Sequence, residues 1–410
     1  MTAPHHKTHP GQHQPRHHRR GFALASLAFL VVMFGTTLPT PLYPLYQQQF
    51  ALSEMLVTII YAVYAAGVIA ALILAGSWSD QIGRRRIMFA ALAFSAASAV
   101  VFLFDAGLGP LLLGRVLSGI SAGLATGTAT VMVIELAPGN RKAMATLTAT
   151  AVNMGGLGLG PLIGGLFAEY APLPLHLIFI VDLALIAIAA GALLITRETV
   201  SIAKHPRLRP QRLSLPREVR GVFIPACIAG FAGFAVLGLF TAVAPAFLGK
   251  VLDLPNLALT GLVVFIVFAA STLGQSILQF VPEKLALPGG CVLLAAGALL
   301  VGAGIDIEAF SLLVAGAVLS GLGQGLGFRA GMTAVTAAAP AARRGEVTST
   351  FFVVLYIAIS IPVIGVGIAA DVFGLRTAGT AFSIAVAALS LIALAALALH
   401  RLMAHRNTAR

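Results

Sequence analysis

Long apolar segments, separated by short polar gaps, make up nearly all of the chain after residue 20. Each segment is long enough to cross a bilayer as a helix, because roughly 20 residues at about 1.5 Å rise span the hydrocarbon core. The pattern predicts an all-α polytopic membrane protein with twelve transmembrane helices. We expect these helices at residues 21–45, 53–76, 87–105, 109–135, 143–168, 175–196, 221–248, 258–281, 287–305, 308–337, 346–370 and 376–400.

Basic residues gather in every second gap between these segments. Of the 26 Lys and Arg residues, 22 lie at the two chain ends and in alternate gaps, such as those with Arg84–Arg86 and Arg141–Lys142. Positively charged loops remain on the cytoplasmic side of a membrane. The pattern therefore predicts a multi-pass protein of the cytoplasmic (inner) membrane with both termini in the cytoplasm.

Composition narrows the class of protein further. Hydrophobic residues make up 59% of the chain and charged residues 10%, which excludes a soluble globular fold. The net charge of +12 lies mostly in short loops at membrane boundaries, so we expect no nucleic-acid partner. The chain has no P-loop sequence for ATP and no constellation of Cys, His or carboxylate groups at membrane depth. We therefore predict no enzymatic activity, no cofactor and no bound metal.

The apolar segments divide into two sets of six around a polar linker. The linker, residues 197–220, contains seven basic residues and three prolines and is predicted to be cytoplasmic. We predict helical bundles at 21–196 and 221–400 and a cytoplasmic tail at 401–410. Residues 1–20, with six histidines, are predicted to form a disordered cytoplasmic tail, and metal binding by its imidazole groups is the alternative.

The second set of segments repeats the first at a shift of 202 residues. Gly114–Gly119 aligns with Gly316–Gly321 in this register, and Pro138 aligns with Pro340. Parallel six-helix repeats, related by an axis along the membrane normal, are a transporter arrangement. We therefore expect a substrate site between two pseudo-equivalent halves.

The gap between the second and third predicted helices contains the pattern G-x-x-x-D-x-x-G-R-R, from Gly76 to Arg85. Gly83 allows a tight turn, Gly76 allows close helix approach, and Asp80 can bind an arginine or a helix N-terminus. The pattern resembles the signature loop of the major facilitator superfamily. Helix count, internal repeat and loop charges extend the resemblance over nearly the whole chain.

The resemblance implies the fold of that superfamily and a conformational latch that joins the two halves in the outward-open state. The implied latch residues are Gly76, Asp80, Gly83, Arg84, Arg85 and Glu135. Glu135, at the cytoplasmic end of the fourth helix, would pair with the loop arginines, and proton carriage is its alternative role. The second half has no matching loop, so the latch is predicted to be one-sided.

The fifth predicted helix contains the pattern G-x-x-x-G-P-x-x-G-G. Glycines at every fourth position leave a groove for close helix packing, and the proline permits a bend. The pattern resembles the antiporter motif of the same superfamily and implies export rather than import. The residues that carry it are Gly156, Gly160, Pro161, Gly164 and Gly165.

Three charged residues, Arg115, Asp182 and Arg329, lie inside apolar segments away from their ends, where a charge requires a partner or a cavity. Arg115 resembles the helix-4 arginine that the superfamily associates with proton coupling, and extension outward to the membrane surface is the alternative. Of the 14 acidic residues, only Asp182 lies clearly within a predicted helix and away from its ends. A carboxyl group in apolar surroundings can bind and release a proton. We predict Asp182 and Arg115 as a coupling pair, with a hydrogen-bonded structural role for Asp182 as the alternative.

Polar and aromatic residues at middle depth are candidates for the wall of a substrate cavity. Depth alone selects them, because the sequence does not tell which face of its helix each residue occupies. The candidates are Tyr61, Tyr64, Asn153, Gln275, Gln324, Arg329 and Tyr356.

These features predict a secondary active transporter that exports amphipathic small molecules of the multidrug type, in exchange for protons, by alternating access. A transporter of a sugar or another metabolite, working in either direction, is the alternative within the same superfamily. A channel or receptor would have no clear use for the repeat and the signature loop. We expect a monomer whose partners are the small-molecule substrate, protons and the lipid bilayer.

Overall fold

The structure, a computed structural model, describes residues 14–408 except residues 105, 140 and 207. The regular elements of these residues are helices, and no strand occurs among them. Twelve helical segments in the described part of the chain are long and apolar enough to cross a membrane. The predicted all-α polytopic fold is therefore confirmed.

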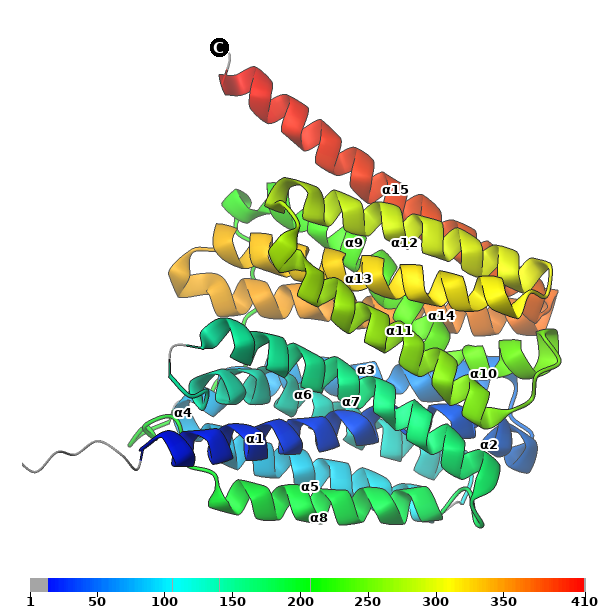
Figure 1. The fold of residues 1–410 in the computed structure, drawn as a ribbon, viewed down its shortest axis with the longest axis horizontal. Coiled ribbons are helices and arrows are strands. Elements are labelled where there is room, and N and C mark those ends of the chain that lie inside the picture. The colour runs from blue at the N-terminus through cyan, green and yellow to red at the C-terminus, as the bar shows by residue number, and fades with distance from the viewer. Residues whose placement is uncertain (1–13, 105, 140, 207, 409–410) are drawn as a thin grey trace, which may run out of the picture.

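Two bundles of six long helices lie side by side, one below the other in Figure 1. The N-terminal bundle contains α1 (Gln14–Thr37), α3 (Glu54–Ala75), α5 (Arg84–Leu103), α6 (Leu108–Glu135), α7 (Lys142–Tyr170) and α8 (Leu177–Ile195). The C-terminal bundle contains α9 (Arg220–Ala242), α11 (Leu257–Ile277), α12 (Glu283–Asp306), α13 (Phe310–Ala338), α14 (Arg344–Phe373) and α15 (Leu375–Thr408). Short helical pieces lie between them: η1 (Thr40–Leu42), α2 (Tyr43–Phe50), α4 (Ser79–Ile82), η2 (Arg217–Val219), α10 (Ala244–Ala246), η3 (Phe247–Val251), η4 (Leu278–Phe280) and η5 (Ala341–Arg343).

The first membrane segment differs from its prediction at both ends. Helix α1 begins at Gln14, inside the stretch that we expected to be disordered, and it ends at Thr37. Pro39 and Pro41 follow, and a proline interrupts a helix because it lacks the backbone N–H and restricts the residue before it. The rest of the predicted tail, residues 1–13 with four of its six histidines, lies outside the described residues.

The two bundles share one register. Helices α6 and α13 begin 202 residues apart, at Leu108 and Phe310. The same shift separates the first residues of α7 and α14, which are Lys142 and Arg344. The shift found in the sequence therefore pairs residues at the same position along equivalent helices.

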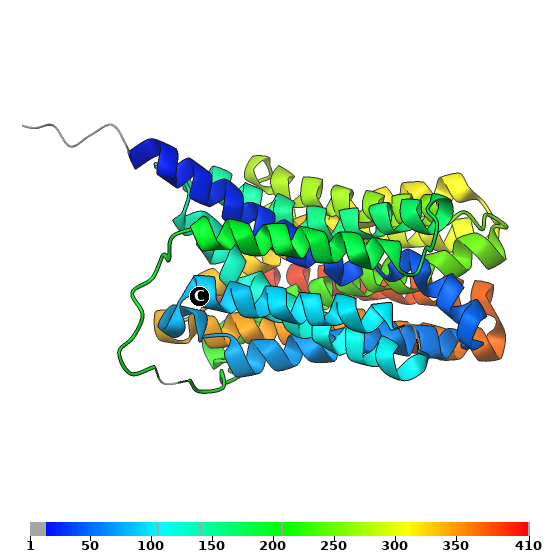
Figure 2. The same cartoon turned by 90° about the horizontal axis from the view of Figure 1, so that it is seen from below.

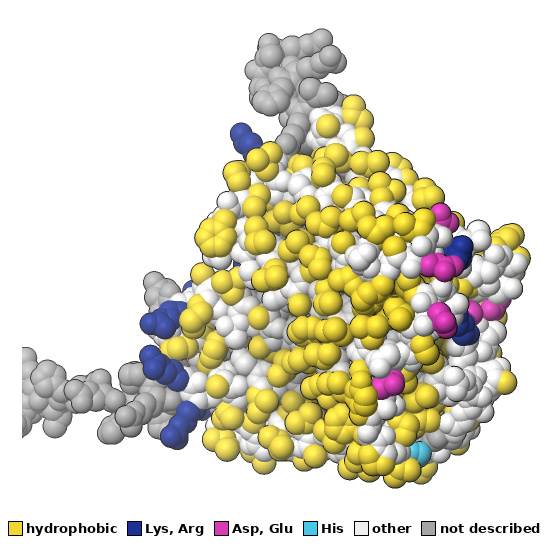
Figure 3. Space-filling view, turned by 45° about the vertical axis from the view of Figure 1, so that its right-hand side comes forward, with side chains coloured by type: hydrophobic (Ala, Val, Ile, Leu, Met, Phe, Trp, Pro, Cys, Tyr) yellow, Lys and Arg dark blue, Asp and Glu magenta, His cyan; other side chains and the backbone are white. Residues whose placement is uncertain are grey.

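Charged residues divide the molecule into two ends, with an apolar band between them (Figure 3). Arg84–Arg86 and the linker 197–220 lie at one end, which we call the basic side. Glu54, Glu169 and Asp371 lie at the other end, which we call the distal side. Helix α1 begins and α15 ends on the basic side, where the linker also runs (Figures 1 and 2).

The bundles pack against each other at the distal side through two equivalent close approaches. An added Cβ at Gly165 of α7 would meet the carbonyl oxygen of Leu257 at the start of α11. An added Cβ at Gly367 of α14 would meet Met55 and Thr58 at the start of α3. Gly165 and Gly367 correspond at the 202-residue shift, and so do Met55 and Leu257. Because glycine has no side chain, the helix backbones approach closely at both places.

One helical turn beyond each of these glycines, a carboxylate caps a helix of the other bundle. Glu169 Oε2 accepts a hydrogen bond from the N–H of Leu257 at 2.8 Å. The carboxylate oxygens of Asp371 accept from the N–H groups of Glu54 at 3.1 Å and Met55 at 3.2 Å. The caps satisfy N–H groups that have no partner within their own helix. We call the two glycine contacts and the two carboxylate caps together the distal seam.

Candidate functional site

A cavity of about 450 Å³ lies between the two bundles. Arg115 lines it together with six of the residues that the sequence selected by depth. These six are Tyr61, Tyr64, Asn153, Gln275, Arg329 and Tyr356.

Gln324, the seventh candidate, does not line the cavity, so this prediction was wrong. Its side chain is buried inside the C-terminal bundle, where Oε1 accepts a hydrogen bond from the hydroxyl of Ser271 at 2.6 Å. On α13 the side chain of Arg329 faces the cavity, whereas that of Gln324 faces α11. The residues have similar depth but lie on different faces of the helix.

The cavity extends along the helices from beneath the distal seam toward the basic side. Tyr61, Tyr64 and Arg115 line its distal end. Toward the basic side the lining includes Thr146, in the second turn of α7, and Thr333, in the last turns of α13. The distal seam therefore closes one end of the cavity, and the other end faces the basic loops.

Several lining residues were absent from the sequence prediction. Thr126 and Thr130 lie one turn apart on α6, and Thr146 and Thr150 lie one turn apart on α7. Their four-residue spacing was the signal available in the sequence, since it places each pair on one helix face. The apolar part of the wall comes mainly from Met33, Met154, Met332, Phe234, Phe268, Phe328 and Phe352.

Arg115 points into the interior, which excludes the alternative that it extends to the membrane surface. Only 2% of the residue is exposed. Its guanidinium lies over the rings of Tyr64 and Tyr61, 4.8 Å and 5.6 Å from their centroids. One amino group donates a hydrogen bond to the carbonyl oxygen of Thr36 at 2.6 Å. These contacts stabilise the charge at the distal end of the cavity.

Asp182 is buried and forms no ion pair with Arg115 among the described residues, and the role of the two as a coupling pair stays a prediction. In the same part of the chain Asp182 Oδ1 has no hydrogen-bond partner. An added Cβ at Gly35 of α1 would lie 2.9 Å from Oδ2 of Asp182. Helix α1 packs against both α6 and α8, and its backbone separates the two charged groups. The hydrogen bonds expected for a structural aspartate are not present at Oδ1 in the described residues.

The glycine face of α7 packs against α1. An added Cβ at Gly156 would lie 2.8 Å from the carbonyl oxygen of Leu30, and one at Gly164 would lie 2.7 Å from that of Leu38. Gly165, by contrast, belongs to the distal seam. The groove expected from the spacing is therefore present, and a role of this motif in the direction of transport stays a prediction.

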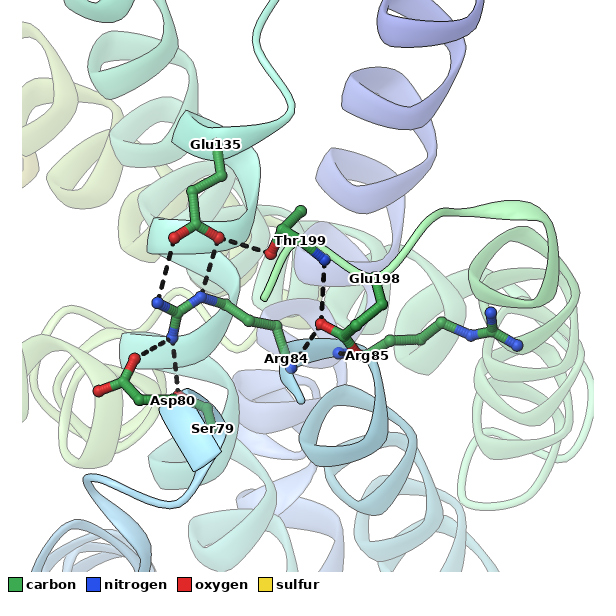
Figure 4. A network of polar contacts seen from close by, with 7 residues as sticks. All are labelled: Ser79, Asp80, Arg84, Arg85, Glu135, Glu198 and Thr199. Carbon is green, nitrogen blue, oxygen red and sulfur yellow. Dashed lines mark hydrogen bonds and ion pairs between the residues drawn. The ribbon is translucent and has the colours of Figure 1, made fainter. Parts of the chain in front are cut away.

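Arg84 is the centre of a charge network on the basic side (Figure 4). Its Nε and one amino group contact the carboxylate of Glu135 at 2.9 Å and 3.1 Å. The other amino group contacts Asp80 at 2.7 Å and the hydroxyl of Ser79 at 2.9 Å. A guanidinium suits this place because its donors form a planar fork that can hold two carboxylates at once.

The linker completes the network with two residues that the sequence did not single out. Glu198 accepts hydrogen bonds from the backbone N–H groups of Arg84 at 2.9 Å and Arg85 at 3.2 Å. The hydroxyl of Thr199 donates to Glu135 at 2.5 Å. The signal available for Glu198 was an acidic residue within a strongly basic linker.

Three predicted latch residues have specific local roles. Gly83 has φ 108°, as the predicted turn requires, and an added Cβ would meet the carboxylate of Glu198. The neighbour of Gly76 is the side chain of Gln211 in the linker, not another helix as we expected. The guanidinium of Arg85 points away from the network, so only its backbone N–H takes part (Figure 4).

The contacts of this network join α4, α5 and α6 to the linker. Among the described residues they do not reach the C-terminal bundle. A latch between the two halves in the outward-open state therefore stays a prediction.

Replacement of Arg84 by lysine is expected to destabilise the protein, because one ammonium group cannot satisfy Glu135, Asp80 and Ser79 together. We expect a loss of about 1 kcal/mol, because Arg84 and Ser79 are buried whereas water can still reach the carboxylates of Asp80 and Glu135. Thermal unfolding of the purified variant measures this loss. Arg86→Lys is the matched control, since Arg86 is exposed. Equal midpoints for the two variants would show that the network does not hold these helices.

Among the described residues, twelve helices long and apolar enough to span a membrane form two equivalent bundles with a cavity between them, which is the architecture of a membrane transporter. Residues 25–361 match the family described as the Major Facilitator Superfamily. The chain belongs to this superfamily.

Two curated relatives are similar to parts of the chain. The quinolone resistance protein NorA of Staphylococcus aureus is 28% identical over 148 residues, which cover 36% of this chain and 38% of NorA. The putative multidrug resistance protein MdtD of Escherichia fergusonii is 26% identical over 171 residues, which cover 42% of this chain and 36% of MdtD. The chain therefore spans less than two fifths of the length of these relatives.

Solved structures share the fold over nearly the whole chain. A bacterial homolog of the human lysosomal transporter Spinster, inward-facing and unoccupied, has a TM-score of 0.71 at 16% identity and covers 95% of this chain and 98% of its own. A POT family transporter in complex with 5-aminolevulinic acid has a TM-score of 0.76 at 14% identity, with coverage of 93% and 96%. At these identities the similarity concerns the fold alone.

Proposed function

We propose that this superfamily member exports amphipathic small molecules by alternating access, driven by the proton gradient. The observation that carries the proposal is the cavity between the bundles, which is closed at the distal seam and lined mainly by aromatic, methionine and threonine side chains. Its volume of about 450 Å³ suits a drug-sized molecule, for which pockets of about 300–1,000 Å³ are typical. The names of NorA and MdtD, which refer to quinolone and multidrug resistance, support this substrate class.

Orientation follows from the charges of the loops. We place the basic side in the cytoplasm of a bacterial inner membrane, with both termini there, because positive loops are retained on that side. The cavity then faces the cytoplasm, and the structure corresponds to an inward-facing state. Export requires the distal seam to open and the basic side to close, which is where the Arg84 network would act as a latch.

Proton coupling is assigned to Asp182 and Arg115 acting through α1 rather than by direct contact. The carboxylate of Asp182 lies against Gly35, and Arg115 donates to the carbonyl oxygen of the next residue, Thr36. A change in the protonation of Asp182 would therefore act on the segment of α1 that also holds Arg115. This segment is next to Pro39, where α1 ends and can bend.

Inside-out vesicles from a host that lacks its own drug pumps test the proposal. The vesicles should accumulate an exported compound when respiration acidifies their interior, and an uncoupler should abolish the accumulation. A susceptibility screen of the same host identifies compounds to measure. Accumulation that persists at the same rate with the uncoupler would rule out the proton as the driving ion.

A further inference from the structure

The cavity between the bundles contains two positive charges and no opposing negative charge. Arg115 of α6 and Arg329 of α13 both line it. No aspartate or glutamate is present among the described lining residues. Among the described residues neither arginine takes part in an ion pair.

Arg115 has a donor that the described part of the protein leaves unused. One amino group donates to Thr36, but Nε has no hydrogen-bond partner in the described part of the chain. The residue is 2% exposed, and the tyrosine rings beside it offer attraction for the charge but no anion. A guanidinium in such a place can hold a carboxylate or sulfonate through parallel hydrogen bonds.

The nearby acidic residues do not supply the missing counterion. Helix α1 separates Asp182 from Arg115, and Glu135 is occupied by Arg84 and Thr199. Arg329 donates to the backbone carbonyl oxygen of Gln275, which carries no net charge. A buried charge without a partner is unfavourable, so the site favours a ligand that brings a negative charge.

The two arginines lie at different depths of the cavity. At the 202-residue shift, Arg329 corresponds to Gly127, which lies twelve residues beyond Arg115 on α6. This separation is about 18 Å along a helix axis, so one compact anionic group contacts one arginine at a time. Arg329 is nearer to the basic side, so a ligand that enters from that side reaches Arg329 first. Arg115 is at the closed, distal end. Phe234, Phe268 and Phe328 provide apolar surface of the same cavity.

We propose that the cavity selects amphipathic anions, molecules with an apolar body and one carboxylate or sulfonate group that binds Arg115. Arg329 attracts the anion into the cavity, and the apolar body lies against the aromatic wall. The proposal deepens the proposed function, on which it rests, by naming the charge of the substrate.

Three naphthalene compounds of the same size test this selection: naphthalene-2-sulfonate, the neutral naphthalene-2-sulfonamide and the cationic 2-naphthylmethylammonium. Their binding to the full-length protein in lipid nanodiscs is measured by equilibrium dialysis, and empty nanodiscs correct for partition into lipid. We expect the sulfonate to bind at least about tenfold more tightly than the other two. A preference for the cation, equal affinities, or no binding of any of the three overturns the proposal.

Variants of the arginines identify the anchor. Arg115→Gln should remove the preference for the sulfonate while the affinity for the sulfonamide stays within about twofold. Arg115→Lys should keep part of the preference, because it keeps the charge. Arg329→Gln should lower the affinity for the sulfonate less than Arg115→Gln does, because Arg329 attracts the anion and does not anchor it. If Arg115→Gln folds and its preference for the sulfonate is unchanged, Arg115 is not the anchor. If Arg115→Gln does not fold, complete loss of the preference in Arg115→Lys contradicts the assignment instead.

The outcome for substrate charge can be separated from the outcome for transport. Accumulation of any compound in the inside-out vesicles supports export, whatever its charge. If neutral or cationic compounds accumulate and the sulfonate neither binds nor accumulates, export stands and anion selection fails. If the sulfonate binds with the expected preference but nothing is accumulated, the anion site stands and proton-driven export fails.

Discussion

Valine at Gly367 is expected to abolish most transport, whereas valine at Gly365, two residues away in the same helix, leaves it nearly unchanged. An added Cβ at Gly367 meets the backbone of Met55 and the side chain of Thr58 across the distal seam. The same group at Gly365 meets nothing within 4 Å. Both substitutions change the helix propensity of α14 equally, so the difference between them reports the contact between bundles.

The size of this effect follows from packing. Insertion of a side chain into a close contact costs about 1–3 kcal/mol. If that free energy acts only on the state with a closed distal seam, the population of this state falls by about 5–150-fold. Gly165→Val should have a similar effect, with Gly155→Val as its control, because an added Cβ at Gly155 also meets nothing within 4 Å. The double variant Gly165→Val/Gly367→Val should show the sum of the two free-energy changes, since the two contacts are distant.

Transport into vesicles measures the loss, and thiol labelling shows which state is populated. With Cys227 and Cys291 replaced by serine, a cysteine at Thr130 in the cavity wall reports access from each side of the membrane. In the Gly367→Val variant, labelling by an impermeant maleimide should increase from the distal side and decrease from the basic side. Normal transport by this variant, with unchanged labelling, would mean that the seam is not the surface that closes the cavity.

Asparagine at Asp182 is expected to lower transport driven by a pH gradient at least about tenfold and to leave ligand binding in the cavity intact. The substitution keeps the shape of the side chain and removes its ability to exchange a proton. Asp182 is 3% exposed and outside the lining of the cavity, so binding should not depend on it directly. Its effect is expected to reach Arg115 through Gly35 and Thr36 of α1.

The measurement compares uptake into vesicles over a range of pH with equilibrium binding to the same protein. Asp306→Asn is the control, because Asp306 is an exposed carboxylate at the distal end of α12. If Asp182→Asn transports like the unsubstituted protein at every pH, Asp182 does not carry the coupled proton. If binding and transport fall together, the role of Asp182 is structural.

Depth in the membrane could be predicted from the sequence, whereas the face of a helix could not. Gln275 and Gln324 have similar surroundings in the sequence, yet only Gln275 lines the cavity. Depth depends on the distance of a residue from the ends of its own apolar segment, which is local information. The direction of a side chain depends on how neighbouring helices are rotated, and twelve nearly uniform apolar helices give little amphipathic signal to fix that rotation.

Charge contacts show the same division. The ion pairs of Arg84 with Asp80 and Glu135 could be expected from the loop pattern, and the structure contains both. The linker residues Glu198 and Thr199 lie in no recognisable pattern, because an extended segment has no periodicity that would place it against the helices.

The sequence by itself determined the twelve crossings, the two sides of the protein and the 202-residue correspondence, since hydrophobic length and loop charge act directly on how each segment sits in a bilayer. Only the tertiary structure decided that α1 separates Asp182 from Arg115, that the distal side is closed and that two arginines share one cavity. These features depend on contacts between helices far apart in the chain. In a membrane such contacts are determined by close packing of the helices rather than by the polarity of their surfaces.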